Sequence, residues 1–158
     1  YRVLEMVKTW MHDNELELHP IKTKVVNERD DDDGFDFLGY TFSKGKRTVR
    51  WKSHMAMHDK IRSLTGRSQG QSLGSIIAKL NPVLRGWFEY FKHAAKWTFR
   101  VIDGFVRRRL RSILRKYNKR SGGTGRGLID HLRWPNAYFA KRGLFTLQEA
   151  HARASESR

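Results

Sequence analysis

The chain has 158 residues, of which 32 are lysine or arginine and 16 are aspartate or glutamate, giving a formal net charge of +16. It contains no cysteine, which excludes disulfides and thiolate chemistry, and no apolar run approaches the ~20 residues of a membrane span. Solubility requires only roughly 2–8 net charges on a small domain. The composition therefore indicates a polyanionic partner, and RNA, DNA and an anionic membrane surface are the candidates.

The charge is unevenly distributed along the chain. Residues 1–50 hold nine basic and ten acidic side chains, whereas residues 51–158 hold 23 basic and six acidic ones. The whole positive excess therefore lies in the C-terminal two thirds. Tyr1 leads directly into a helical pattern, so we expect the chain to be a segment of a longer protein.

The first fifty residues predict one helix and a small antiparallel sheet. Apolar side chains recur at helical spacing over residues 2–13, and KTKVV at 22–26 favours a strand. The run NERDDDDG at 27–34 lacks the spacing of a calcium loop, so it is interpreted as a solvated hairpin tip rather than a metal site. The sheet is completed by a β-prone run FDFLGYTF at 35–42, a turn at 43–46 and a return strand at 48–51.

Residues 55–98 predict three helical segments and a linker. A short helix at 55–68 runs into a polar linker at 65–71, and Ser72 is placed to cap the helix that follows. Asn81-Pro82 predicts the end of that helix and the start of another, because proline fits the first helical turn and asparagine is a good N-cap. Gly86 would cost about 1 kcal/mol inside this second helix, which predicts a close helix contact there.

The helix expected at 99–116 combines apolar positions at steps of three and four with a dense row of arginines. Arginine binds phosphate in a bidentate manner and stacks on bases, so its dominance over lysine favours folded RNA as the partner. We expect Arg107, Arg108, Arg111 and Arg115 to face outward and Arg109 to be shared with a neighbouring element. A solvated helix face without a ligand is the alternative interpretation.

The C-terminal region predicts a basic loop and short helices. The glycine-rich loop at 122–127 can fold onto RNA, and a short helix or turn follows at 128–132. Trp134, Pro135, Tyr138 and Phe139 indicate an aromatic packing cluster, and a last helix is expected at 147–154. The seven histidines show no metal-binding spacing, so no metal ligand is assigned.

Several blocks carry a resemblance to a known family. LELHPIKTKVV followed by FDFLGYTF resembles the last two conserved blocks of a reverse transcriptase palm. LNPVLRGWFEYFKHA, IDGFVRRRLRSILRK and GLFTLQEAH resemble the thumb and maturase domain of group II intron-encoded proteins. The resemblance runs from Tyr1 to about His151. It implies an α+β chain: a palm end with a small antiparallel sheet at 1–54, a connecting helix and linker at 55–71, and a mainly α-helical thumb and maturase domain at 72–158.

The resemblance also implies roles for single residues. Lys22 would lie near the phosphates of an incoming nucleotide, although spacing alone favours an ordinary exposed strand lysine. Phe37, Leu38, Gly39 and Tyr40 match the element called the primer grip, where Gly39 would let the backbone approach a strand terminus. A buried hairpin is the structural alternative for this block, and the two interpretations are compatible.

The chain departs from the family at the catalytic block. The Tyr-x-Asp-Asp turn that holds Mg²⁺ for nucleotidyl transfer is missing, and the consecutive aspartates at 30–33 fall after its expected position. We therefore expect no catalytic residue and no cofactor in this chain, with Mg²⁺ required only by a longer parent. The chain alone should not polymerise nucleic acid.

The expected function is binding of group II intron RNA, which would promote splicing and retrohoming in a bacterial cytoplasmic ribonucleoprotein. The alternative is gripping an RNA/DNA primer–template, or target DNA, for a polymerase whose aspartates lie outside this chain. No membrane partner is expected, and a second copy of the chain is a candidate partner. The expected RNA-binding cations are Arg85, Lys92, Lys96, Arg100, Arg107, Arg108, Arg111, Arg115, Lys116, Lys119, Arg120 and Arg126.

Overall fold

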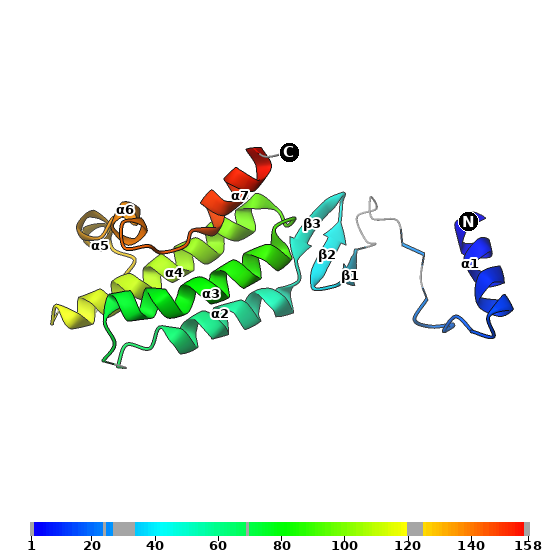
Figure 1. The fold of residues 1–158 in the computed structure, drawn as a ribbon, viewed down its shortest axis with the longest axis horizontal. Helices are drawn as coiled ribbons and strands as arrows, with labels where there is room; N and C mark the ends of the chain where they lie inside the picture. Colours follow the sequence, from blue (N-terminus) through cyan, green and yellow to red (C-terminus); the bar gives the residue numbers. More distant parts are fainter. Residues whose placement is uncertain (1, 24, 27–33, 69, 120–124, 157–158) are drawn as a thin grey trace.

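The computed structural model describes residues 2–23, 25–26, 34–68, 70–119 and 125–156. A small three-stranded antiparallel sheet is followed by a bundle of helices, so the α+β prediction is confirmed (Figure 1). Helix α1 stands apart from the sheet and the bundle in this view, whereas the sheet lies against one end of the bundle.

Helix α1 spans Arg2–Asp13, as its apolar periodicity predicts, but it buries none of its residues. The strand expected at 22–26 is wrong for its described residues. The chain turns at His19 instead, where the backbone N–H groups of Ile21 and Lys22 both donate to Nδ1 of His19 at 3.2 Å. These donors are unavailable to a β-ladder. The expected acidic turn falls on residues 27–33, which lie outside the described residues.

The sheet has the strand order β1-β2-β3, with β1 at Phe35–Phe37, β2 at Tyr40–Ser43 and β3 at Lys46–Val49. The run expected as one strand at 35–42 is therefore two strands. Leu38 and Gly39 separate them with φ values of 46° and 79°, as a two-residue type I′ turn requires. Cross-strand pairing sets Phe35 opposite Phe42, and their rings stack at 5.0 Å.

Helix α2 spans Trp51–Leu64 and follows β3 with one residue between them. The expected return strand through Trp51 and the expected helix start at 55 are therefore both wrong at this junction. The Arg50 backbone N–H still bonds the Gly39 carbonyl at 2.8 Å, and helical geometry begins at the next residue. Met57 and Ile61, one turn apart, are buried and hold α2 against the bundle.

Helix α3 spans Leu73–Phe91 without interruption, so the break expected at Asn81-Pro82 is wrong. Ser72 does cap the helix, because its Oγ accepts a hydrogen bond from the Ser75 backbone N–H at 3.2 Å. Leu80 and Leu84, on either side of the proline, are fully buried. Their packing outweighs the roughly 3 kcal/mol that proline costs inside a helix.

The Asn81 side chain does not cap a helix but forms hydrogen bonds with a loop that is distant in the sequence. Its Nδ2 donates to the Gly143 carbonyl, and its Oδ1 accepts from the Phe145 backbone N–H, both at 2.8 Å. The contact expected at Gly86 is also wrong, since a Cβ added there would meet no atom within 4 Å.

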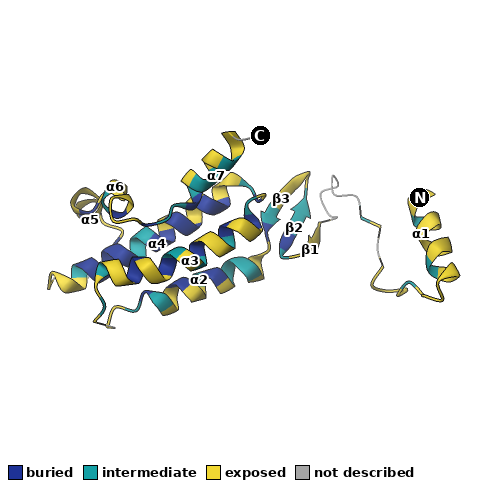
Figure 2. Cartoon of the chain, viewed as in Figure 1, coloured by how far each residue is buried: buried dark blue, intermediate teal, exposed yellow. Residues whose placement is uncertain are grey.

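Helix α4, at Lys96–Tyr117, runs through the middle of the bundle and carries the largest share of the core (Figure 2). Phe99, Ile102, Leu110 and Ile113 are fully buried at the spacing expected of a core-facing helix. Helix α7, at Leu147–Glu156, packs on α4.

Asp103 fixes α7 on α4. Its carboxylate accepts hydrogen bonds from the backbone N–H groups of Leu147 and Gln148, at 3.0 Å each, at the start of α7. Burial raises the pKa of Asp103, and these hydrogen bonds oppose that rise. The acid therefore caps a helix that lies more than forty residues further along the chain.

Two short helices cover the other end of α4: α5 at Leu128–Arg133 and α6 at Asn136–Ala140. Trp134 and Phe139 are buried between these helices and the core, so the expected aromatic cluster packs as a structural unit. Gly125, just before α5, has a φ of 76°, and an added Cβ would lie 2.6 Å from the Arg108 carbonyl oxygen. The chain therefore returns to α4 in close backbone contact.

Candidate nucleic-acid interface

Arg111 is an internal anchor, and the expectation that it faces outward is wrong. The residue is only 2% exposed. Its Nε donates to the Trp134 carbonyl and its Nη2 donates to Oδ1 of Asn136, both at 2.9 Å. The guanidinium also lies over the Phe139 ring at 5.4 Å. Helices α5 and α6 cover this side of α4, so Arg111 cannot reach a bound nucleic acid.

Arg115 has a similar anchoring role at the next turn of the helix, so the outward orientation expected for it is also wrong. Its Nη1 donates to Oδ1 of Asp130 at 2.8 Å, and that carboxylate is buried in α5. Removing Arg115 would leave the buried Asp130 carboxylate without this charged partner.

Arg107 and Arg109 are half-buried on two other sides of α4. Burial lowers the pKa of Arg107, while the carboxylates of Asp103 and Glu149 oppose the change. Arg109 donates from Nη2 to the Thr65 carbonyl at 2.6 Å and from Nε to the Thr65 hydroxyl at 3.0 Å. The prediction that Arg109 is shared with a neighbouring element is therefore confirmed, whereas Arg107 is only partly outward.

One side of α4 carries a row of residues that we call the α4 stripe, made of the basic residues Lys96, Arg100 and Arg108, with Gly104 between the last two. Successive members are four residues apart and therefore neighbours on the helix surface. Lys96 and Arg100 are exposed and Arg108 is half-buried. Trp97 lies beside the stripe with 52% of its surface exposed, and sequence reasoning did not single it out. An exposed indole next to cations is a suitable stacking surface for an unpaired base.

The other predicted cations are dispersed around the bundle. Arg85 is exposed with its guanidinium over the Phe145 ring, and Lys92 pairs with Glu89 at 3.0 Å. Lys116 donates to the Ser68 hydroxyl at 2.9 Å, at the opposite end of α4 from Lys96. Lys119 and Arg126 are exposed, and Arg120 lies outside the described residues.

Five arginines surround one open pocket of about 360 Å³, which we call the arginine pocket. Its cationic lining comes from α2, the segment after α2, α4 and the segment before α5. Phe105 and Ser112 complete the lining, and none of the described lining residues is acidic. The five arginines are Arg62, Arg67, Arg108, Arg109 and Arg126. Sequence reasoning placed only two of them, Arg108 and Arg126, among the expected RNA contacts.

The Phe37–Tyr40 block is a hairpin tip fastened to α3. The Tyr40 hydroxyl donates to the Tyr90 carbonyl at 2.7 Å, and the Tyr90 hydroxyl donates to the Leu38 carbonyl at 3.0 Å. Gly39 lies close to Phe91, since an added Cβ would come within 3.2 Å of its ring. Tyr40 is buried, whereas Phe37 and Leu38 are 58% and 64% exposed. The block is thus a packed hairpin with an apolar tip open to solvent.

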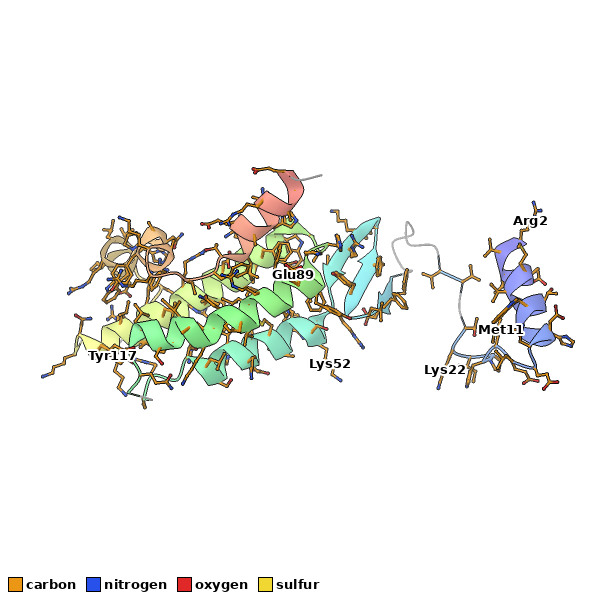
Figure 3. All side chains as sticks on the ribbon, viewed as in Figure 1. Arg2, Met11, Lys22, Lys52, Glu89 and Tyr117 are labelled. Carbon is orange, nitrogen blue, oxygen red and sulfur yellow. The ribbon has the colours of Figure 1, made fainter. Side chains whose placement is uncertain are left out.

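Lys22 is exposed in a turn beside α1 and is not part of the sheet (Figure 3). No group of three histidine, aspartate or glutamate side chains that could hold a metal occurs in the described part of the chain. The rings of His54 and His58 instead contact each other in a tilted arrangement with their centroids 4.6 Å apart, and His58 stacks on Phe105 at 4.1 Å. Burial lowers the pKa of both histidines.

Residues 54–129 match the family model described as "Group II intron, maturase-specific domain". The match runs from α2 to the start of α5 and therefore includes the α4 stripe and the arginine pocket. A search of the curated proteins found no match. Across the described residues, no helix is long and apolar enough to cross a membrane.

Proposed function

Because residues 54–129 of this chain belong to the maturase-specific domain family of group II introns, we propose that the chain is the RNA-binding part of an intron-encoded reverse transcriptase/maturase. It binds intron RNA and stabilises the folded form in which the RNA catalyses its own splicing. The protein contributes positioning and charge neutralisation rather than a catalytic side chain. Homing of the intron into DNA belongs to the longer parent, for which Mg²⁺ and the catalytic aspartates are supplied elsewhere.

The observation that carries this proposal is the α4 stripe within the matched residues. Neither Lys96 nor Arg100 forms an ion pair with any other described residue, so both charges remain available to phosphate. Each phosphate that they neutralise releases condensed counterions, which favours binding. The exposed Trp97 ring beside them supports recognition of an RNA with unpaired bases.

A second function is supported by the hairpin tip at residues 37–40. Phe37 and Leu38 project an apolar surface from a turn that Tyr90 holds to α3. Such a fixed backbone turn suits contact with the end of a primer strand, as the primer grip would require. In the full-length parent the same chain would then help to hold a primer–template while a separate palm copies RNA into DNA.

The proposal is tested by measuring binding to a folded group II intron RNA transcript over a salt series, with duplex DNA and unstructured RNA of equal length as competitors. We expect the folded RNA to bind most tightly. The double variant Lys96→Gln/Arg100→Gln should weaken binding and reduce the salt slope by about 0.7–0.9 for each lost phosphate contact.

The matched control is Arg142→Gln/Arg153→Gln, which removes two exposed arginines outside α4. Its salt slope should stay close to that of the unmodified chain. Equal affinity for all three nucleic acids would contradict the maturase proposal. An unchanged slope for the Lys96/Arg100 variant would exclude the α4 stripe as the contact surface.

A further inference from the structure

The arginine pocket is assembled from segments that are far apart in the sequence. Arg62 comes from α2 and Arg67 from the segment after it, Arg108 and Arg109 come from α4, and Arg126 precedes α5. A solvated basic helix would instead spread its charges along one element. Here the fold brings five guanidinium groups around a single hollow.

The positive charge of the pocket is only slightly compensated by carboxylates. Arg62 pairs with Asp59 at 2.5 Å. Among the described residues, no other arginine of the pocket forms an ion pair. Burial lowers the pKa of Arg109, and the positive charges of Arg62 and Arg67 lower it further. The like charges therefore repel one another when the pocket contains only solvent, and a bound anion would relieve that repulsion.

Two of the pocket arginines are held in place by the fold. Arg109 is fixed by its two hydrogen bonds to Thr65, and Arg108 lies over the Phe105 ring at 4.9 Å. Ordered guanidinium groups lose less conformational entropy when they bind an oxyanion. Gly125 adds to this order, because its close approach to the Arg108 carbonyl brings the segment of Arg126 against α4.

We propose that the arginine pocket binds one phosphate group, and that in the complex this is a single backbone phosphate of the RNA held by several arginines at once. Tetrahedral phosphate oxygens accept the bidentate hydrogen bonds that guanidinium groups donate. The pocket and the α4 stripe share Arg108, so one RNA strand can follow the stripe and enter the pocket. The choice of RNA as the phosphate donor rests on the proposed function, whereas phosphate binding itself does not.

The first test uses inorganic phosphate and needs no RNA. We expect the melting temperature of the whole chain to be higher in sodium phosphate than in sodium chloride of the same ionic strength, because a ligand that binds only the folded state stabilises it. The variant Arg67→Gln/Arg108→Gln/Arg126→Gln should lose this difference, and the control Arg2→Gln/Arg142→Gln/Arg153→Gln should keep it. The single variant Arg67→Gln, at an exposed position, should reduce the difference if the triple variant folds poorly.

Equal melting temperatures in phosphate and chloride would contradict the proposal that the arginine pocket binds a phosphate group. So would a difference that is as large in the pocket variant as in the unmodified chain. If phosphate stabilises the chain but no RNA binds it, the proposed function fails while the phosphate site stands.

The second test is the salt slope of RNA binding. Because the three substituted arginines hold one phosphate, the triple pocket variant should lower the slope by only about 0.7–0.9 in total, together with a loss of affinity of about tenfold or more. A fall of about 2–3 in the slope would show that the arginines contact separate phosphates and would overturn the proposal. RNA with a 5′-hydroxyl end should bind as tightly as RNA with a 5′-phosphate, and a preference for the 5′-phosphate that the pocket variant loses would overturn the assignment to the backbone.

Discussion

Arg108 and Arg111 lie three positions apart in α4, yet they serve different purposes. Arg108 lines an open pocket, whereas Arg111 is closed off by α5 and α6 and bonded to Trp134 and Asn136. Basic residues in this helix therefore include both charges open to solvent and internal anchors. The distinction decides how a substitution should behave.

Replacing Arg111 with glutamine should lower the free energy of unfolding by about 2–4 kcal/mol, because the buried Trp134 carbonyl and the Asn136 side-chain carbonyl lose their charged donor. Chemical denaturation measures this loss. At a temperature where the variant stays folded, its affinity for RNA and its salt slope should match those of the unmodified chain.

The control for this prediction is Arg108→Gln. It should change stability by less than about 0.5 kcal/mol while altering RNA binding. The anchoring role of Arg111 would be contradicted if both variants lost the same stability, or if the folded Arg111 variant lost a phosphate contact.

Sequence reasoning succeeded for Arg109 because three consecutive arginines span most of a helical turn, and at least one must face a neighbour. It failed for Arg111 and Arg115 because their partners, Trp134 and Asp130, are 15–23 residues away in the chain. Nothing in the spacing of the arginines indicates which face α5 and α6 will cover.

At the scale of elements, helical periodicity located α2, α3, α4, α5 and α7 but not every boundary, and the residues of α6 predicted only an aromatic cluster. Apolar core residues such as Ile76 and Phe99 belong to patterns that repeat every three or four positions, and these patterns do not depend on how the helices pack together. The breaks depend on tertiary contacts. The Asn81-Pro82 pair is typical of a helix start. In the structure, however, the Asn81 side chain forms hydrogen bonds with Gly143 and Phe145 instead of capping a helix, and α3 continues through Pro82.

Two glycines of the bundle should respond in opposite directions to alanine. Gly86 lies inside α3 with open space around its Cβ position, so Gly86→Ala should stabilise the chain by about 1 kcal/mol. Gly125→Ala should destabilise it, because Gly125 has a φ of 76° and its Cβ would collide with the Arg108 carbonyl. Thermal unfolding of the two variants checks both signs. A destabilising Gly86→Ala would mean that another surface packs against α3.

At the scale of the whole molecule, the arginine pocket is the feature that sequence could not reveal. Its lining joins residues from position 62 to position 126, and only the packing of α2 against α4 brings them together. The net charge of +16 indicated a polyanion, but it does not distinguish a dispersed basic surface from a focused one. Focusing depends on the fold.

The neighbouring residues His54 and His58 should make the stability of the chain depend on pH. Burial lowers the pKa of His54 and His58 in the folded state, while in the unfolded chain both regain values near 6.5. The unfolded chain therefore binds more protons, so their contribution is present above pH ~6.5 and is lost as the pH falls through the folded-state pKa. The free energy of unfolding should decrease between pH 7.5 and pH 5.5.

Urea denaturation at the two pH values measures this decrease. The variant His54→Gln/His58→Gln should show a smaller difference, and His131→Gln, at an exposed position, should leave it unchanged. Asp103 has a raised pKa, which acts in the opposite direction, but it is present in all three proteins and cancels from the comparison. An equal pH response in all three would rule out the histidines as its source.

The two tyrosine hydrogen bonds between the hairpin and α3 have a mechanical consequence. Tyr40 and Val49 share one core with the helices, and Tyr90 grips the hairpin tip from the end of α3. The tip and the α4 stripe therefore belong to a single stiff body and are separated by a fixed span. If a nucleic acid bound both the stripe and the tip, its two contact sites would be separated by a distance that the packing of the hairpin on α3 sets.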